Sequence, residues 1–490
     1  MSTLIQPPPP SYRKWWWVPA TFVVVALVVG AAIWVPTFFR EDNSCGPGVV
    51  YSGPDRECVG VTDGSHVFAT ELRDIEQRIL DENRRVETSG DPYVSVVTMS
   101  PMTAGEGDES IVTMAGIRHR LEGAHLAQLA ENRAAATPKI KLLVAHPGNL
   151  FGEWETTVGK IEERREADHI VAVTGIAFSV QDAGRAVERL SALQIPVIGS
   201  TLTADDLPVV RGFYRVSPTA AGHARAAAEY LATDADRIMV VRDDNPTDHY
   251  GRALDAAFRA RFAEQPQRIV GRVAPYDSEV GNVATAFRGM LPNICRNTPD
   301  TIYFAGRAAH ALSFLTVLAE RTCPELQIQV VTGDDMAYYN LADSPARIAL
   351  ENRVSVLYTG LVHEEAWRLR PDLFNQVAVA RFADECAGDL CYRALSADPL
   401  DDFAAVMEHD AVLTAVHAIR QAADYAGTVV TPGQVIQTLK GLHEAAQISG
   451  ASGMLSFDEQ GLPTGKPILI LKANVGERPE YVGLSVTSSG

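Results

Sequence analysis

Short apolar runs alternate with amphipathic stretches over most of the chain. Mostly aliphatic runs cover residues 94–98, 140–145, 169–173 and 195–199, and between them apolar residues recur three or four positions apart. Such runs are typical of strands buried on both faces, and the stretches between them are typical of helices that pack on one side. The order of these elements predicts a parallel sheet with helices on both faces.

The same alternation restarts farther along. Predicted strands with intervening helices cover residues 237–241, 269–273, 301–305, 327–331 and 354–358. Two successive sheets predict two lobes, and the crevice between two lobes is a natural ligand site. The remaining predicted elements are helices over 373–387, 403–426 and 430–442 and a β-hairpin over 453–471.

The N-terminal part has a pattern of its own. Residues 18–39 are uncharged, and as a helix they would extend about 33 Å, enough to cross a bilayer core. Arg13 and Lys14 precede this stretch, so the positive-inside rule places the N-terminus in the cytoplasm. We therefore expect a single-pass cell-membrane protein with an extracytoplasmic main domain. The alternatives, a cleaved signal peptide or a lipoprotein, lack a small-residue cleavage site or a lipobox here.

Two features separate this stretch from the first predicted sheet. Residues 41–64 are rich in Gly, Pro and Asp, which favours a linker. Residues 65–86 form a predicted amphipathic helix. Its apolar stripe consists of Phe68, Leu72, Ile75 and Ile79. This stripe packs either on the main domain or on a second copy of itself.

The cysteine content favours disulfides. The chain has six cysteines, and an even number in an exported chain is typical of disulfide pairing. Pairing by proximity joins Cys45 to Cys58, Cys295 to Cys323 and Cys386 to Cys391. Because many other connectivities are possible, this pairing is a hypothesis from sequence distance alone. Zinc ligation is the alternative, although no C-x-x-C motif is present.

Composition narrows the class of protein. The chain has 490 residues and a formal net charge of −18. Its hydrophobic content of 46% is typical of a globular protein. The negative charge disfavours a nucleic-acid partner. The G-x-S-x-G, H-E-x-x-H and Walker motifs are absent, so we predict no enzymatic activity, no catalytic residue, no cofactor and no metal site. A hydrolytic enzyme whose nucleophile and base meet only in the fold is the less favoured alternative.

Short stretches in a characteristic order are similar to the Leu/Ile/Val-binding receptor family of branched-chain amino acid ABC-transporter substrate-binding proteins. The matching stretches are residues 97–103, 121–124, 195–207, 250–251, 299–306 and 457–458, of which 195–207 is the most specific. The resemblance extends over residues 91–475. It implies the type I periplasmic-binding fold, an α/β fold with two doubly wound parallel-sheet lobes joined by a three-strand hinge, preceded here by one transmembrane helix.

Pattern and resemblance together set the expected domain boundaries. They are a cytoplasmic tail (1–14), a transmembrane helix (15–40), an extracytoplasmic linker with an amphipathic helix (41–90), a first lobe (91–217 and 354–452), a second lobe (218–353 and 453–475) and a tail (476–490). The chain would cross between lobes near residues 217, 353 and 453. Closure about these crossings would trap a ligand.

The resemblance also implies a set of ligand-binding residues. They are Ser179, Ser200, Thr201 and Thr203 in the first lobe and Tyr250, Arg307 and Asp334 in the second. Hydroxyl groups suit a carboxylate, and an acidic side chain suits an ammonium group. Arg307 departs from the family, which often has an aromatic residue there. A guanidinium would suit a second acidic group on the ligand, which puts branched-chain amino acids in doubt.

Each of these assignments has an alternative. The Ser and Thr residues, and Asp334 with them, could cap helices instead of contacting a ligand. Arg307 could pair with a surface carboxylate, and Tyr250 could belong to the core.

We therefore predict a membrane-anchored, extracytoplasmic solute-binding protein that traps a small polar, amino-acid-like ligand. It would serve ABC-type uptake together with a permease, or it would sense the ligand. The alternative is the ectodomain of a signalling or effector system. Such a system would need a protein partner, because a cytoplasmic tail of about 14 residues is too short to fold as a domain.

Overall fold

The computed structural model describes residues 43–104, 113–246, 248–339, 341, 344–396, 398, 400, 402–426, 429–443, 447–476 and 478–487. The chain divides into two units, Met1–Cys45 and Gly46–Gly490. The short strand β1 (Ser44–Gly46) lies at their boundary, and the elements that follow belong to the second unit.

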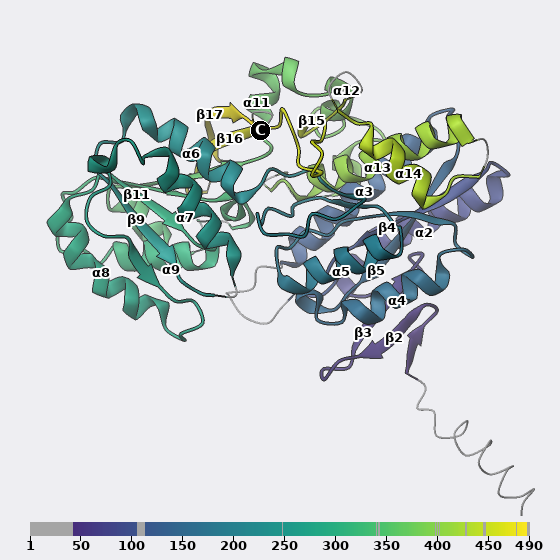
Figure 1. Cartoon of the computed structure of the whole chain (residues 1–490), viewed down its shortest axis with the longest axis horizontal. Helices are drawn as coiled ribbons and strands as arrows, with labels where there is room; N and C mark the ends of the chain where they lie inside the picture. Colours follow the sequence, from purple (N-terminus) through teal and green to yellow (C-terminus); the bar gives the residue numbers. More distant parts are fainter. Residues whose placement is uncertain are drawn as a thin grey trace, which may run out of the picture. The chain divides into compact units, whose positions relative to one another are not determined.

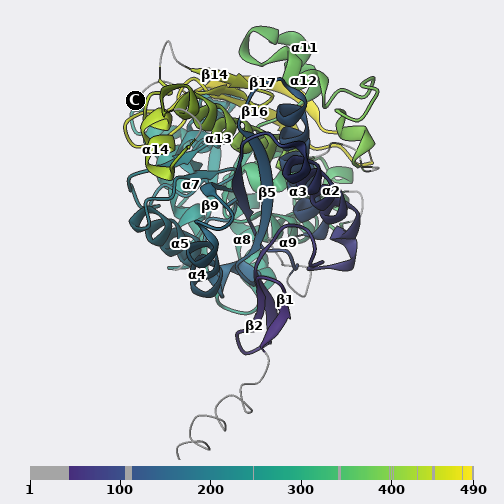
Figure 2. The same cartoon turned by 90° about the vertical axis from the view of Figure 1, so that its right-hand side faces the viewer.

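The first sheet of this unit has the order β2-β3-β5-β4-β6-β7-β8. Its strands are β2 (Val49–Ser52), β3 (Glu57–Thr62), β4 (Tyr93–Met99), β5 (Lys139–His146), β6 (Ile170–Thr174), β7 (Val197–Gly199) and β8 (Phe213–Arg215). The neighbouring strands β5, β4, β6, β7 and β8 are parallel to one another. The covering helices are α2 (Arg73–Ser89), α3 (Met114–Arg133), α13 (Ala404–Ala426) and α14 (Pro432–Lys440), with α4 (Trp154–Arg164) and α5 (Gln181–Ala192) on the opposite face. Figure 2 shows β5 between α2 and α3 on one side and α4 and α5 on the other.

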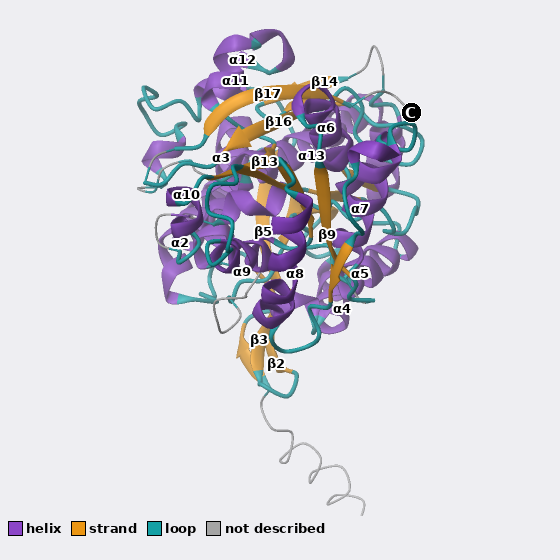
Figure 3. Ribbon diagram, turned by 90° about the vertical axis from the view of Figure 1, so that its left-hand side faces the viewer, coloured by secondary structure: helices purple, strands orange, loops and turns teal. Residues whose placement is uncertain are grey.

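The second sheet has the order β10-β9-β11-β12-β13-β16-β17. Its strands are β9 (Ile238–Asp243), β10 (Ala274–Tyr276), β11 (Thr301–Ala305), β12 (Ile328–Thr332), β13 (Val354–Gly360), β16 (Pro467–Lys472) and β17 (Glu480–Val486). The last two are antiparallel and the others parallel. Its helices are α6 (Ala220–Asp234), α7 (His249–Arg261), α8 (Val283–Asn297), α9 (Ala308–Leu318) and α10 (Arg347–Glu351). Figures 1 and 3 show this sheet with its helices.

The remaining helices and strands connect the two sheets. They are α11 (Glu364–Leu369), α12 (Gln376–Ala380), β14 (Ile448–Gly450) and β15 (Gly453–Leu455). The predicted α/β class with two largely parallel sheets is thereby confirmed. The central strands are rich in apolar residues because helices cover both of their faces, and every residue of β5 is buried.

Helices α3 and α13 pack directly on each other in the core of the first lobe. Gly123 makes this close approach possible. A Cβ atom at this position would lie 1.9 Å from the carbonyl oxygen of Ala405. Such a distance is far inside van der Waals contact, so no other residue fits there without a movement of the backbone.

Residues 49–52 and 57–62 of the predicted linker 41–64 are instead strands of the first sheet. Strands β2 and β3 pair with each other, and β3 pairs with β5, both antiparallel. The predicted amphipathic helix corresponds to α2, which starts later, at Arg73. Leu72, Ile75 and Ile79 are buried in the first core, so the stripe packs on the main domain.

Several other predicted boundaries differ from the structure. The division at 353/354 separates β13 from the sheet in which it pairs with β12 and β16. The predicted tail 476–490 contains β17, which pairs with β16. In the predicted hairpin 453–471, β15 pairs with β14 rather than with β16. These errors share one cause, because local apolar pattern does not specify which strand is a strand's neighbour.

Two local predictions also fail. The apolar run 269–273 contributes only a bridge from Ile269 to Ile238, and the strand β10 begins five residues later, at Ala274. The predicted helix 373–387 is reduced to the short helix α12. Downstream of α12 the chain turns repeatedly and is closed by the disulfide Cys386–Cys391.

The predicted single-pass membrane topology is corrected. Among the described residues, no helix is long and apolar enough to cross a bilayer. Helices α3 and α13 have the length, but each carries charged side chains within its sequence and packs on the other. The predicted tail 1–14 and span 15–40 lie outside the described residues. The single-pass localisation is therefore withdrawn.

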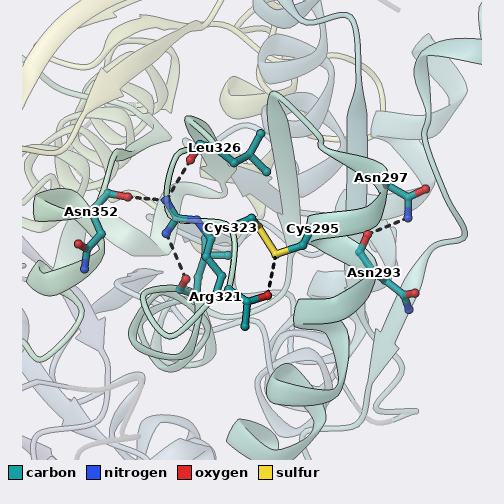
Figure 4. Close-up of a disulfide and its surroundings, with 9 residues drawn as sticks. Asn293, Cys295, Asn297, Arg321, Cys323, Leu326 and Asn352 are labelled. Carbon is teal, nitrogen blue, oxygen red and sulfur yellow. Dashed lines mark hydrogen bonds between the residues drawn. A yellow bond between two sulfur atoms is a disulfide. The ribbon is translucent and has the colours of Figure 1, made fainter.

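Two of the predicted disulfides are confirmed. Cys295 at the end of α8 is bonded to Cys323 after α9, and Cys386 is bonded to Cys391. Cys45 and Cys58 are disulfide-bonded as well. Figure 4 shows that Arg321, beside the first bridge, donates hydrogen bonds to backbone carbonyls, including that of Leu326 at 3.0 Å. This corner of the second lobe is thus held by covalent and polar contacts together.

Candidate functional site

A cavity lies where loops from the two lobes face each other. The first sheet contributes the loops after β6 and β7, and the second contributes the start of α7, the loop after β11 and the 3-10 helix η5 (Asp334–Tyr338) after β12. Because parallel strands end at the same edge of a sheet, these loops converge although they are distant in sequence. The enclosed space is small, about 40 Å³.

The structure brings six of the seven predicted site residues to this cavity. They are Ser179, Thr201, Thr203, Tyr250, Arg307 and Asp334. Ser200 does not line it and is fully buried. Burial raises the pKa of the Glu408 carboxyl, and the hydroxyl of Ser200 acts against this rise. Ser200 therefore faces the core, because successive side chains of an extended segment point to opposite sides.

The three hydroxyl residues of the first lobe tie its loops together. Ser179 Oγ accepts hydrogen bonds from the backbone N–H groups of Thr203 and Ala204, both at 3.0 Å. Thr201 Oγ1 donates to the carbonyl of Ala177 at 2.9 Å. The hydroxyl groups of Ser179 and Thr201 are bound to loop groups and not to helix termini, so the predicted capping alternative does not describe these two residues. The loops after β6 and β7 form one rigid wall of the cavity.

Tyr250 and Asp334 form the opposite wall. The Tyr250 hydroxyl donates to Asp334 Oδ1 at 2.7 Å and accepts from the backbone N–H of Asp334 at 3.1 Å. A Cβ atom at position 333 would lie 2.0 Å from this hydroxyl, so Gly333 makes the arrangement possible. Tyr250 belongs both to the core of the second lobe and to the cavity wall.

Arg307 is already paired with a carboxylate of its own lobe. Its Nε and one terminal nitrogen donate to the two oxygens of Asp248 at 2.7 and 3.0 Å, and its guanidinium lies 4.6 Å from the ring of Tyr250. Burial works against its charge, but Asp248 outweighs this and keeps the pKa of Arg307 above its usual range. Arg307 also reaches the carbonyl of Ser179 in the first lobe, at 3.5 Å.

Asp335 is a cavity residue that the sequence analysis did not select. Its Oδ2 accepts from the backbone N–H of Ala308, at 2.8 Å. Burial raises the pKa of Asp335 to about 7, with Arg307 acting against the rise and Asp334 adding to it. The available signal was the acidic pair at positions 334 and 335, which begins three residues after the end of a predicted strand.

Arg120 is a second residue that was missed. It lies on α3 with its guanidinium 5.0 Å from the ring of Phe178 and 5.7 Å from that of Tyr338. It donates to Thr201 Oγ1 at 3.0 Å and to the Tyr338 hydroxyl, in the second lobe, at 2.9 Å. The available signal was its position, three residues after Ile117, on the apolar face of the helix.

The described residues offer no candidate metal site. In the part of the chain that the structure describes, no three or more His, Cys, Asp or Glu side chains are grouped as ligands of a metal ion. The cavity instead combines hydroxyl, aromatic, acidic and guanidinium groups. Such groups bind small polar molecules through hydrogen bonds and charge.

Comparisons with known proteins agree with this architecture. No family model and no curated protein sequence matches the chain. A leucine-binding protein from Thermotoga maritima is similar in structure, with a TM-score of 0.59, 16% identity and coverage of 81% of this chain and 99% of that one. An ABC-transporter substrate-binding protein from Desulfitobacterium hafniense in complex with Leu has a TM-score of 0.56, 18% identity and coverage of 80% and 100%.

A third similar structure binds a different kind of molecule. It is an ABC-transporter solute-binding protein from Rhodopseudomonas palustris in complex with 3,4-dihydroxybenzoic acid, with a TM-score of 0.59, 15% identity and coverage of 81% and 98%. At these identities the likeness concerns the fold. The chain has the α/β fold with two mixed sheets that is found in the solute-binding proteins of ABC transporters, the type I periplasmic-binding fold.

Proposed function

We propose that this protein is a solute-binding protein that traps a small amino-acid-like ligand between its two lobes. The observation that carries this proposal is the composition of the cavity, which contains side chains of both lobes. A ligand bound there would touch both walls, and so it would favour the closed arrangement over an open one.

The charges of the cavity support a ligand with two unlike ends. The first lobe contributes the guanidinium of Arg120 and the hydroxyl groups of Ser179 and Thr203, while the second contributes the adjacent acids Asp334 and Asp335. Arg307 adds little net charge because Asp248 is bound to it. An amino acid would direct its carboxylate toward the first lobe and its ammonium group toward the second.

Contacts between the lobes close the cavity. Arg120 of the first lobe donates to Tyr338 of the second, and Arg307 of the second donates to the carbonyl of Ser179 in the first. These few side-chain contacts can break when the lobes separate, which would admit and release the ligand. Delivery to an ABC permease, or sensing through another partner, would then depend on which form the partner recognises.

A melting-temperature screen tests the proposal. We expect at least one compound from a panel of L-amino acids, small carboxylates and amides to raise the melting temperature. A ligand at 100 times its Kd adds about 2.7 kcal/mol to the free energy of unfolding. Thr203→Ala and Asp334→Asn should each weaken binding about tenfold, by loss of a hydrogen bond or a charge.

Matched variants control for general effects of substitution. Thr88→Ala on α2 and Asp236→Asn before β9 alter exposed residues outside the cavity, and binding should be unchanged in both. The proposal is abandoned if no compound shifts the melt of the wild type, or if the two cavity variants bind each hit as tightly as the wild type does.

The acidity of Asp335 predicts that binding depends on pH. Its pKa of about 7 means that the side chain is largely ionised only above neutral pH. An ammonium group binds the ionised form of Asp335. Affinity should therefore rise by at most about tenfold per pH unit as the pH approaches 7, and it should level off above pH 7. Calorimetric titrations across this range should show the trend, and Asp335→Asn should flatten it. A steep dependence that survives in Asp335→Asn would contradict the assignment.

A further inference from the structure

Arg120 has more hydrogen-bonding capacity than the protein uses. It is only 2% exposed. Of the five N–H donors of its guanidinium, one on each terminal nitrogen is bound, by Thr201 and Tyr338. The buried Nε has no partner in the described structure. Unsatisfied donors on a buried cation are costly, so a residue kept in this state needs a reason.

The described residues also give Arg120 no counter-ion. None of their carboxylates lies within ion-pair distance of it, whereas Arg307, across the cavity, has Asp248. The charge of Arg120 acts on the buried Glu408, but the oxygen of that group accepts hydrogen bonds from Thr98 and Thr174 and not from Arg120. The guanidinium therefore lines the cavity with no carboxylate of the described residues bound to it.

The surroundings of Arg120 hold its guanidinium in a fixed position. The rings of Phe178 and Tyr338 lie near it. Thr201 Oγ1, which accepts from Arg120, has its own proton bound to the carbonyl of Ala177. The hydroxyl of Thr201 is thus occupied, so it positions Arg120 and has no proton left for a ligand. A planar, pre-positioned guanidinium matches the two oxygens of a carboxylate.

We propose that Arg120 binds the carboxylate of the ligand and selects solutes that carry one. This proposal rests on the proposed function, because it names the chemistry of the same cavity. The carboxylate is thereby assigned to Arg120, on a helix of the first lobe, and not to the hydroxyl groups of that lobe to which the resemblance assigned it. Arg307, which was expected to suit a second acidic group, is bound to Asp248. Asp334 and Asp335 at the other end repel a second carboxylate, so the selected class is small monocarboxylates, amino acids included.

The test compares each acid with its own amide. Every hit of the melting screen, or acetate and acetamide if there is none, is titrated against the wild type, Arg120→Met and the control Arg133→Met, at constant ionic strength. Arg133 lies at the exposed end of the same helix. We expect the wild type and Arg133→Met to bind the acid about 10- to 100-fold more tightly than the amide, and Arg120→Met to lose this preference.

A second readout does not depend on a ligand. Because Arg120→Met removes a buried charge to which no described carboxylate is bound, the ligand-free variant should melt about 1–3 °C above the wild type. Equal binding of acid and amide by the wild type overturns the proposal, and so does an acid preference retained in Arg120→Met or a lowered melting temperature of that variant. A wild type that binds amino acids and their amides equally would leave the solute-binding function standing while removing the role of Arg120. A wild type that binds acetate but no amino acid would keep the role of Arg120 while removing the amino-acid-like ligand of the proposed function.

Discussion

Replacing Asp410 with asparagine is expected to lower the free energy of unfolding by about 3–5 kcal/mol, because it leaves a buried lysine without its counter-charge. Asp410 lies on α13 and accepts hydrogen bonds from the backbone N–H groups of Ala451 and Ser452, at 3.1 and 2.7 Å. The Ser452 hydroxyl also donates to it, and Lys466 Nζ donates to that hydroxyl at 2.6 Å. All of these side chains are fully buried.

This network holds the segment that passes from β14 to β16. Burial alone would raise the pKa of Asp410, but His409, Lys466 and Ser452 hold it below its usual range. Burial lowers the pKa of Lys466 to about 8, with Asp410 acting against the fall. In both cases the charge of the other residue favours the ionised form and acts against the effect of burial. The chain crosses between the lobes here, so the network also fixes one strand of the hinge.

Urea-induced unfolding, followed by circular dichroism, would measure the effect. Asp424→Asn, an exposed change on the same helix, is the control and should be neutral. The double variant Asp410→Asn with Lys466→Met should recover part of the loss, since it removes both charges together. A loss below about 1 kcal/mol in the single variant, or none recovered in the double variant, would refute the account in which Asp410 compensates the charge of Lys466 through Ser452.

Gly123→Ala is expected to cost about 2–4 kcal/mol and to weaken ligand binding as well. The new methyl group would meet the backbone of Ala405, whose carbonyl oxygen and carbon lie 1.9 and 2.6 Å from the Cβ position. A backbone carbonyl cannot rotate away, so α3 and α13 must move apart, at a cost that exceeds the gain in helix propensity of about 1 kcal/mol. Binding suffers because α3 carries Arg120.

Thermal melts of the ligand-free protein and calorimetric titrations would separate the two effects. Gly289→Ala on α8 is the matched control, because no atom lies within 4 Å of its Cβ position. This control should be neutral or more stable by up to about 1 kcal/mol. If Gly123→Ala behaves like Gly289→Ala, the helices are not as closely packed as the structure places them.

Much of the architecture could be predicted from the amino-acid sequence. The apolar runs of β4, β5, β6, β9, β11 and β12 are local signals in the sequence. The point at which the alternation of strands and helices begins again, which divides these strands into two sheets, is also a local signal. Two disulfides between near neighbours were also predictable. Six of seven expected site residues line the cavity because they follow parallel strands, whose ends converge whatever the details of packing.

The tertiary structure alone decided how those elements pair and how the charges of the site are distributed. Arg120 and Tyr338 are 218 residues apart and Arg307 and Asp248 are 59 apart, so no local pattern shows that one guanidinium is paired with a carboxylate and the other is not. The place of β13 in the second sheet and of β2 and β3 in the first is equally non-local. Apolar periodicity reports which face of an element is buried, whereas strand neighbours and ion pairs depend on which elements the fold brings together.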